Sequence, residues 1–63
     1  MTITASQMTV EHLGPDASEG DLLDFRGWVR ELMAARQLSE AEATDLLWGD
    51  GDYLANAFRF GLF

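Results

Sequence analysis

The chain has 63 residues and a mass of 7.0 kDa, enough for one small domain. A single core of this size supplies only about 3–5 kcal/mol of stability. The absence of cysteine excludes disulfides and thiolate zinc sites as support. Asp and Glu total 11 against 4 Lys and Arg, a net charge of -7, so the chain repels nucleic acid and anionic membranes and attracts basic surfaces.

The hydropathy of the sequence excludes further classes of protein. The hydrophobic fraction of 48% is too high for a disordered acidic tail, and no apolar run approaches the roughly 18–20 residues that span a membrane. Residues 1–6 have neither the basic region nor the apolar region of a secretion signal. We therefore expect a folded protein of the cytoplasm, which is the host cytoplasm if a phage encodes it.

The first fifteen residues have the composition of extended chain. Apolar and polar residues alternate at Ile3/Ala5 and again at Met8/Val10, with a slip of phase between them. This pattern predicts one or two short strands, turning near Ser6-Gln7, with a frayed arm as the alternative. Gly14-Pro15-Asp16 then ends the segment, because proline excludes helical geometry from the residue before it.

Three helices are predicted after this break. From Asp16 or Ser18 to Gln37, apolar residues recur at helical spacing, namely Leu22, Phe25, Val29, Leu32 and Met33. Ser39 and Glu42 have capping-box spacing, so a second helix begins at Glu40 with Ala43, Leu46 and Leu47 inward and ends by Trp48-Gly49. After the turn at Asp50-Gly51-Asp52, a third stripe consists of Tyr53, Leu54, Ala57, Phe58 and Leu62.

The predicted fold class is therefore mainly α, with α+β as the alternative if the first segment pairs as strands. It is a compact mini-domain of two or three helices. Residues 1–63 form one acidic domain, with an extended or strand-like arm at 1–15 and a helical body at 16–63. Short loops favour antiparallel or helix-turn-helix packing of neighbouring helices.

Catalytic and cofactor chemistry finds little support in the residues. His12 is the only histidine, which leaves both a metal site and a Ser–His–acid nucleophile incomplete. Asp50-Gly51-Asp52 resembles the start of a calcium loop, but Leu54 and Gly61 stand where acids are needed. The chain has no lysine for a phosphate loop. We expect no enzyme activity, no cofactor and no metal.

Direct DNA binding is also disfavoured, although the second and third helices have helix-turn-helix spacing. A recognition helix needs positive charge and base-reading groups, and the segment 52–60 offers only Asn56 and Arg59.

The placement of the acids is the most informative feature. No arginine has an acid three or four positions away within its own helix, whereas Asp21 and Asp24 are three apart, as are Glu42 and Asp45. Such stacking of like charge costs stability, so a use for the negative potential is one interpretation and a solvated surface is the other. The candidate partner-binding residues are Asp16, Glu19, Asp21, Asp24, Glu31, Glu40, Glu42, Asp45, Asp50 and Asp52.

In its small size, lack of cysteine, helical pattern and uncompensated Asp and Glu, the whole chain resembles the small phage-encoded anti-CRISPR proteins that mimic DNA. That group has no signature motif, so no residue role transfers by position. The resemblance implies a non-catalytic inhibitor that binds a basic surface, such as the PAM or DNA channel of a CRISPR effector subunit.

The aromatic residues support an alternative function. Four of them are candidates for apolar contact with a partner, namely Trp28, Trp48, Phe60 and Phe63. The chain is then a small adaptor or antitoxin-like regulator that binds its partner or itself, as a monomer or a homodimer. Packing in the core is the simpler interpretation of these rings. Salt separates the two functions, because electrostatic mimicry weakens with salt and apolar docking does not.

Overall fold

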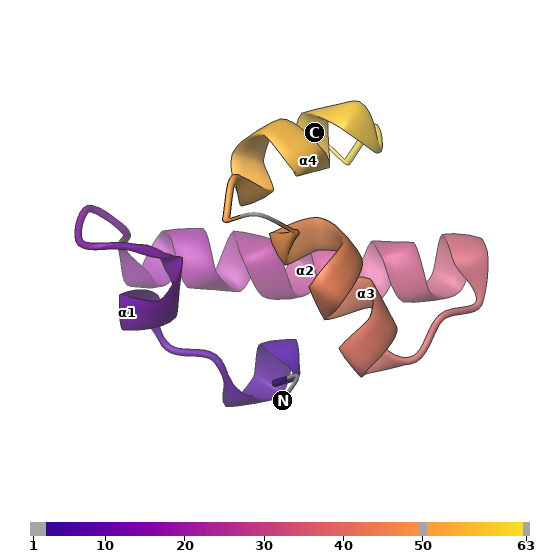
Figure 1. Cartoon of the computed structure of the whole chain (residues 1–63), viewed down its shortest axis with the longest axis horizontal. Coiled ribbons are helices and arrows are strands. Elements are labelled where there is room, and N and C mark those ends of the chain that lie inside the picture. Colours follow the sequence, from indigo (N-terminus) through magenta and orange to yellow (C-terminus); the bar gives the residue numbers. More distant parts are fainter. Residues whose placement is uncertain (1–2, 50, 63) are drawn as a thin grey trace.

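The computed structural model describes residues 3–49 and 51–62, and in them every regular element is helical (Figure 1). The elements in chain order are the 3-10 helix η1 (Ala5–Gln7) and the α-helices α1 (Val10–Leu13), α2 (Glu19–Arg36), α3 (Glu40–Trp48) and α4 (Tyr53–Arg59). The prediction of a mainly α mini-domain is confirmed, and the α+β alternative finds no strand in the described residues.

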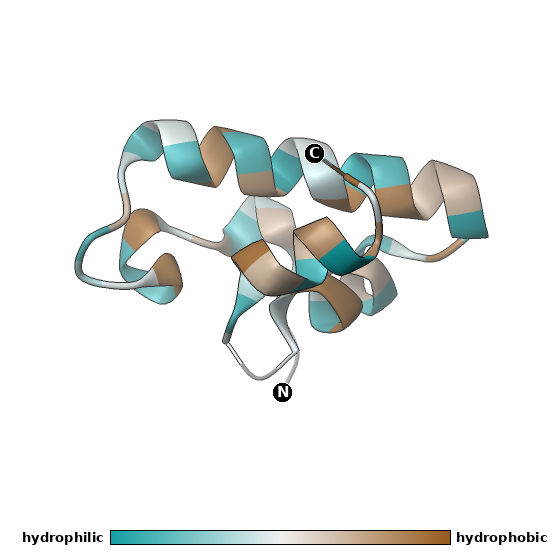
Figure 2. Ribbon diagram, turned by 90° about the horizontal axis from the view of Figure 1, so that it is seen from above, coloured by the Kyte–Doolittle hydropathy of each residue, from teal (hydrophilic) through white to brown (hydrophobic). Residues whose placement is uncertain are grey.

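Helix α2 is the longest element, and the others pack against one side of it. Helices α1, η1 and α3 contact α2 directly, whereas α4 packs on α3. In the view from above, the opposite long side of α2 stays uncovered (Figure 2). Within the described part of the chain, one face of α2 is therefore uncovered along the length of the helix.

The helix boundaries follow the predicted capping signals. Helix α3 begins at Glu40 after its Ser39 cap, and Asp52 caps α4 by accepting from the Ala55 N–H. Helix α2 has a second capping box, between Ser18 and Asp21, and ends at Gln37 in left-handed geometry (φ 54°). These contacts satisfy backbone groups that helix ends leave without partners, which explains why the three predicted helices agree with the structure.

The prediction of strands in the first fifteen residues is wrong. Thr4 and Thr9 each begin a helical turn, because the side chains of Gln7 and His12 accept their backbone N–H groups at 3.0 Å. The slip of phase at Ser6-Gln7 marks the break between two short helices. A polar side chain three residues after a threonine favours such a turn over extended chain.

This N-terminal segment packs on the core and is not a frayed arm. The Ala5 N–H donates to Thr44 Oγ1 at 3.0 Å. The Arg26 guanidinium donates to the carbonyls of Ala5 and Met8 at 3.1 and 3.2 Å. Ala5 and Met8 are buried as a result.

The core also differs from the predicted stripes in α3 and α4. Three residues expected to face inward are exposed: Leu46 (38%), Leu54 (50%) and Phe58 (76%). Thr44 and Asn56 are buried in their place. Both helices are rotated so that these polar side chains face backbone groups. Thr44 bonds to the Ala5 N–H and to the Glu40 carbonyl. Asn56 bonds to the Leu47 carbonyl. The hydrophobic core consists of Ala5, Met8, Leu13, Phe25, Val29, Leu32, Ala43, Leu47, Tyr53 and Ala57.

Candidate functional site

Negative charge is concentrated at the N-terminal end of α2. Residues 1–25 contain five acidic residues and no lysine or arginine. The first arginine is Arg26, and its guanidinium is turned toward the carbonyls of η1 and the chain after it. The positive end of the helix dipole stabilises acids there. We call the set Asp16, Glu19, Asp21 and Asp24, on the loop before α2 and on its first two turns, the acidic end.

Several of the predicted contact residues accept hydrogen bonds within the described part of the chain. Asp21, Glu42 and Asp52 accept from the backbone N–H groups of Ser18, Ser39 and Ala55 respectively, and Glu40 accepts from both the N–H and the hydroxyl of Ser6. The charge pattern of the sequence leaves these acids uncompensated, because only arginines were considered as their partners. Backbone N–H groups at helix N-termini compensate Asp21, Glu42 and Asp52, and the N–H and hydroxyl of Ser6 compensate Glu40.

Two of these bonds lower carboxyl pKa values. The Ser6 hydroxyl, assisted by the Ser6 N–H and by the charge of Arg30, holds the pKa of Glu40 below its ordinary value of 4.5. The backbone N–H and hydroxyl of Ser39 lower the pKa of Glu42 in the same direction. Both donors stabilise the charged carboxylate.

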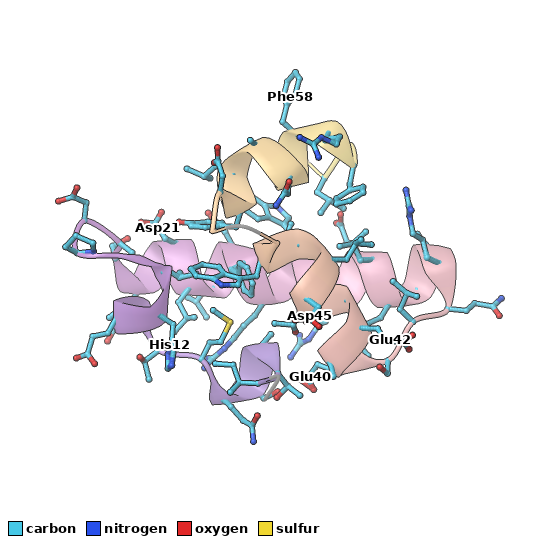
Figure 3. All side chains as sticks on the ribbon, viewed as in Figure 1. His12, Asp21, Glu40, Glu42, Asp45 and Phe58 are labelled. Atoms are coloured by element: carbon cyan, nitrogen blue, oxygen red, sulfur yellow. The ribbon has the colours of Figure 1, made fainter. Side chains whose placement is uncertain are left out.

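The other predicted acids are exposed and differ in their position. Asp16, Glu19, Asp24 and Glu31 make no hydrogen bond or ion pair with the described part of the chain. The first three belong to the acidic end, and Glu31 lies further along α2. Glu40 and Glu42 lie well away from Asp21 (Figure 3). Asp45 is exposed on α3, and Asp50 lies outside the described residues.

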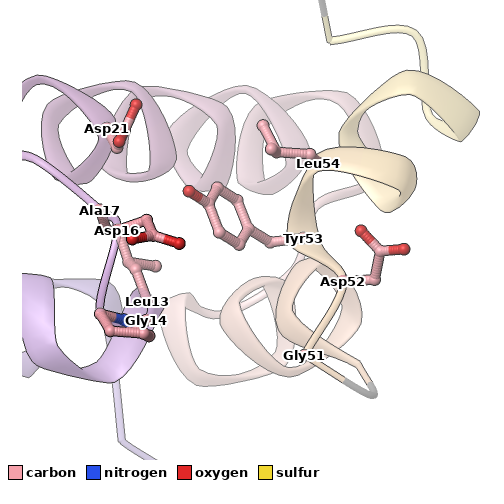
Figure 4. Close-up of a pocket in the computed structure, with 10 residues that line it drawn as sticks. Leu13, Gly14, Asp16, Ala17, Asp21, Gly51, Asp52, Tyr53 and Leu54 are labelled. Carbon is pink, nitrogen blue, oxygen red and sulfur yellow. The ribbon is translucent and has the colours of Figure 1, made fainter.

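A cleft opens between the acidic end and the start of α4 (Figure 4). Its volume is about 340 Å³, at the lower end of the range for small-ligand pockets. Asp16, Ala17 and Asp21 line one side, and Gly51, Asp52, Tyr53 and Leu54 line the other, with Leu13, Gly14 and Pro15 completing the wall. Two segments that are far apart in the sequence thus line one cavity, with Asp16 and Asp21 on one side of it.

Tyr53 is the most buried polar residue of the cleft, at 8% exposure. Its ring stacks on Trp48 with centroids 6.1 Å apart and meets the edge of Phe25 at 5.5 Å. Its hydroxyl makes no hydrogen bond to the described residues. It is directed toward the side of the cleft that carries Asp16 and Asp21 (Figure 4).

Burial raises the pKa of the Tyr53 phenol, and the charges of Asp21 and Asp24 raise it further. All three effects disfavour a phenolate, so Tyr53 keeps its proton at neutral pH. No described polar side-chain atom is both fully buried and unpartnered, so the hydroxyl reaches solvent through the cleft.

The predicted aromatic contacts prove to be mostly parts of the packing. Trp28 and Trp48 are half-buried beside Tyr53, with ring centroids at 6.3 and 6.1 Å. Phe60 packs on the core beneath the Arg36 guanidinium, which lies 5.0 Å from its ring centroid. Phe63 lies outside the described residues.

The sequence prediction missed Leu54 and Phe58 as surface residues. Figure 3 shows Phe58 projecting from α4 away from the rest of the molecule. Their spacing of four residues matched a core stripe, and only the rotation of α4 shows that they face solvent.

Among the described residues, no group of three or more acids or histidines is placed to hold a metal ion, and no helix is long and apolar enough to cross a membrane. Comparisons of the chain with family models, curated proteins and solved structures found no match.

Proposed function

We propose that this protein is a non-catalytic inhibitor that occupies the basic, nucleic-acid-binding surface of a target protein by mimicking DNA. The observation that carries the proposal is the acidic end, where Asp16, Glu19 and Asp24 have no partner within the described chain. Carboxylates left free at neighbouring positions repel one another, and a basic partner removes this cost.

The free side of α2 supports the same function. Asp24 and Glu31 are seven residues apart on α2, about 10.5 Å along the helix axis at 1.5 Å per residue. Gly27 lies between them, and a Cβ built there meets no atom within 4 Å. A row of carboxylates on a slim helix offers regularly spaced negative charge to arginines and lysines that normally bind backbone phosphates.

The proposed target is a subunit of a CRISPR effector complex that recognises DNA or its PAM. The support is the resemblance in size, charge and helical character to anti-CRISPR proteins of the DNA-mimic kind. In this proposal the protein acts as a stoichiometric inhibitor inside the cell that contains the CRISPR effector complex.

Competition with duplex DNA tests this function. Purified CRISPR effector complexes are bound to labelled target DNA, and the protein is added at increasing concentration. We expect it to displace DNA from a susceptible complex, with an affinity that falls steeply as salt rises. Binding that leaves DNA in place, or that is unchanged by salt, contradicts mimicry.

A pair of double variants locates the surface. Asp16→Asn/Asp24→Asn and Glu42→Gln/Asp45→Asn remove the same two charges, the first pair at the acidic end and the second on α3. Glutamine at position 42 retains the capping function. We expect only the first double variant to lose competition. An equal loss in both means that net charge alone carries the effect.

A second candidate function follows from the exposure of Leu54 and Phe58, one turn apart on α4. Such a patch suits an adaptor or antitoxin-like regulator that docks through apolar contact. In that case Phe58→Ser abolishes partner binding, and the affinity of the unchanged protein is insensitive to salt.

A further inference from the structure

The cleft between α2 and α4 combines three features that a cationic side chain requires. It has carboxylates on its rim, an apolar wall, and a hydroxyl, carried by a buried ring, that has no partner among the described residues. The first comes from Asp16 and Asp21, and the second from Leu13, Pro15 and Leu54. The third is the Tyr53 hydroxyl, on a residue more than nine-tenths buried.

The unpartnered hydroxyl is the decisive observation. The Tyr53 ring is buried, but its hydroxyl is open to the cleft and has no hydrogen-bond partner among the described residues, whereas the buried side chains of Thr44 and Asn56 have theirs. The Tyr53 ring is held in place by Trp48, Phe25 and Trp28. Since the ring cannot turn freely, its hydroxyl stays directed into the cleft and is preorganised to meet a ligand.

Asp21 is held in place as well. One of its carboxylate oxygens accepts from the Ser18 N–H at 2.9 Å, which fixes the side chain at the edge of the cleft. A carboxylate has more acceptor capacity than this bond uses. Asp21 also raises the pKa of Tyr53, which places its charge close to the hydroxyl.

We propose that this cleft binds the guanidinium group of an arginine side chain from the partner protein. The N–H groups of the guanidinium donate to the Asp21 carboxylate and to the Tyr53 hydroxyl oxygen, Asp16 adds a second negative charge, and the arginine methylenes lie along Leu54. The inference rests on the proposed binding to a basic protein and assigns one contact within that surface.

Arginine fits these acceptors better than lysine. Its planar group presents five donors in a fixed fork, so it reaches two acceptors on different helices at once. Guanidinium is also more weakly hydrated than ammonium, which lowers the cost of entering a cleft lined partly by apolar groups.

Titration with small arginine derivatives tests the site without knowledge of the partner. Nα-acetyl-arginine methylamide is added to the isotopically labelled protein, and backbone amide signals are followed by NMR. We expect saturable shifts at residues 13–17, 21 and 51–54, about tenfold weaker binding of the lysine analogue, and no saturation with the uncharged citrulline analogue. Equal binding of lysine, or saturation by citrulline, overturns the assignment.

Three variants complete the test. Asp21→Asn keeps an oxygen that accepts from the Ser18 N–H and removes the charge, and Tyr53→Phe keeps the ring and removes only the hydroxyl. We expect Asp21→Asn to weaken arginine binding about tenfold or more and Tyr53→Phe by several fold. Glu42→Gln removes the same charge from α3, away from the cleft, and keeps the affinity. Equal loss in Glu42→Gln overturns the site.

The experiments distinguish failure of the arginine site from failure of DNA mimicry. If the protein displaces DNA from an effector but no arginine derivative saturates the cleft, the arginine site is wrong and mimicry stands. If arginine saturates the cleft and no DNA-binding protein is inhibited, the site stands and mimicry fails.

Discussion

The side-chain amide of Asn56 donates a hydrogen bond of 2.8 Å to the carbonyl oxygen of Leu47. This bond joins α4 to the last turn of α3, where helical carbonyls have no partner within the helix. Asn56 is 7% exposed, so water does not readily replace the amide. The corner between the two helices, and with it the position of Tyr53 in the cleft, depends on this contact.

Asn56→Ala is expected to lower the free energy of unfolding by about 1–3 kcal/mol, because it leaves the Leu47 carbonyl without a partner. In a chain whose core supplies only about 3–5 kcal/mol, this loss is large. Chemical denaturation followed by circular dichroism measures the change. Ala55→Ser on the exposed side of α4 serves as the control and changes stability little. Equal stability of both variants contradicts a structural role for Asn56.

Substitution by alanine is expected to have opposite effects on stability at Gly49 and at Gly27. Gly49 has φ 51°, and a Cβ there lies 2.9 Å from Asn56 Nδ2, so Gly49→Ala destabilises the α3–α4 corner. Gly27 lies within α2 and a Cβ there meets nothing within 4 Å, so Gly27→Ala stabilises the protein by about 0.5–1 kcal/mol. Thermal melting of the two variants, shifted in opposite directions, checks both. A stabilising Gly49→Ala contradicts the described turn.

Thr44 anchors the N-terminal segment to α3. Its hydroxyl accepts from the Ala5 N–H at 3.0 Å and donates to the Glu40 carbonyl at 2.7 Å. Thr44→Val keeps the shape but leaves the buried Ala5 N–H without an acceptor, at a cost of about 1–3 kcal/mol. Thr44→Ser retains the hydroxyl and most of the stability.

Hydrogen exchange of the Ala5 amide measures the protection that its hydrogen bond to Thr44 provides. We expect the amide to exchange much faster in Thr44→Val than in Thr44→Ser, because its acceptor is lost. Similar protection of Ala5 in the two variants rules out the proposed anchor.

The contact between Ser6 and Glu40 predicts a pH effect of defined sign. The pKa of Glu40 lies below 4.5 in the folded chain, because Ser6 donates two hydrogen bonds to its carboxylate. The unfolded chain therefore binds this proton more readily than the folded chain. The stabilisation is present above pH 4.5 and is lost as the pH falls through the lower folded value.

Comparison with Glu40→Gln isolates this contribution. Relief of the general negative charge at low pH stabilises both proteins, so only their difference reports on Glu40. We expect the unchanged protein to be more stable than Glu40→Gln at pH 7 and the gap to close below pH 4.5. A gap that is constant from pH 7 to pH 3 means that the Ser6 contact does not depend on charge.

Local signals predicted most of the helices but not the geometry of the cleft. The Ser39–Glu42 capping box and the stripe from Leu22 to Leu32 act within a few residues, so α2 and α3 follow from the sequence alone. The N-terminal segment was misread, because its turns depend on Gln7 and His12 as caps and on contacts with Thr44 and Arg26 across the fold. Alternation over a few residues does not report such distant partners.

The sequence by itself determined the helical class, the helix ends and the excess of negative charge, because propensity, capping and composition are local or additive properties. Only the tertiary structure decided which acids are free and which side of α4 is exposed. Backbone N–H groups compensate Asp21, Glu42 and Asp52. In α4, the hydrogen bond from Asn56 to the Leu47 carbonyl fixes the rotation of the helix, which leaves Phe58 exposed to solvent. The cleft at Tyr53 joins segments thirty or more positions apart, and its shape depends on the ring contacts of Tyr53 with Phe25 of α2 and Trp48 of α3.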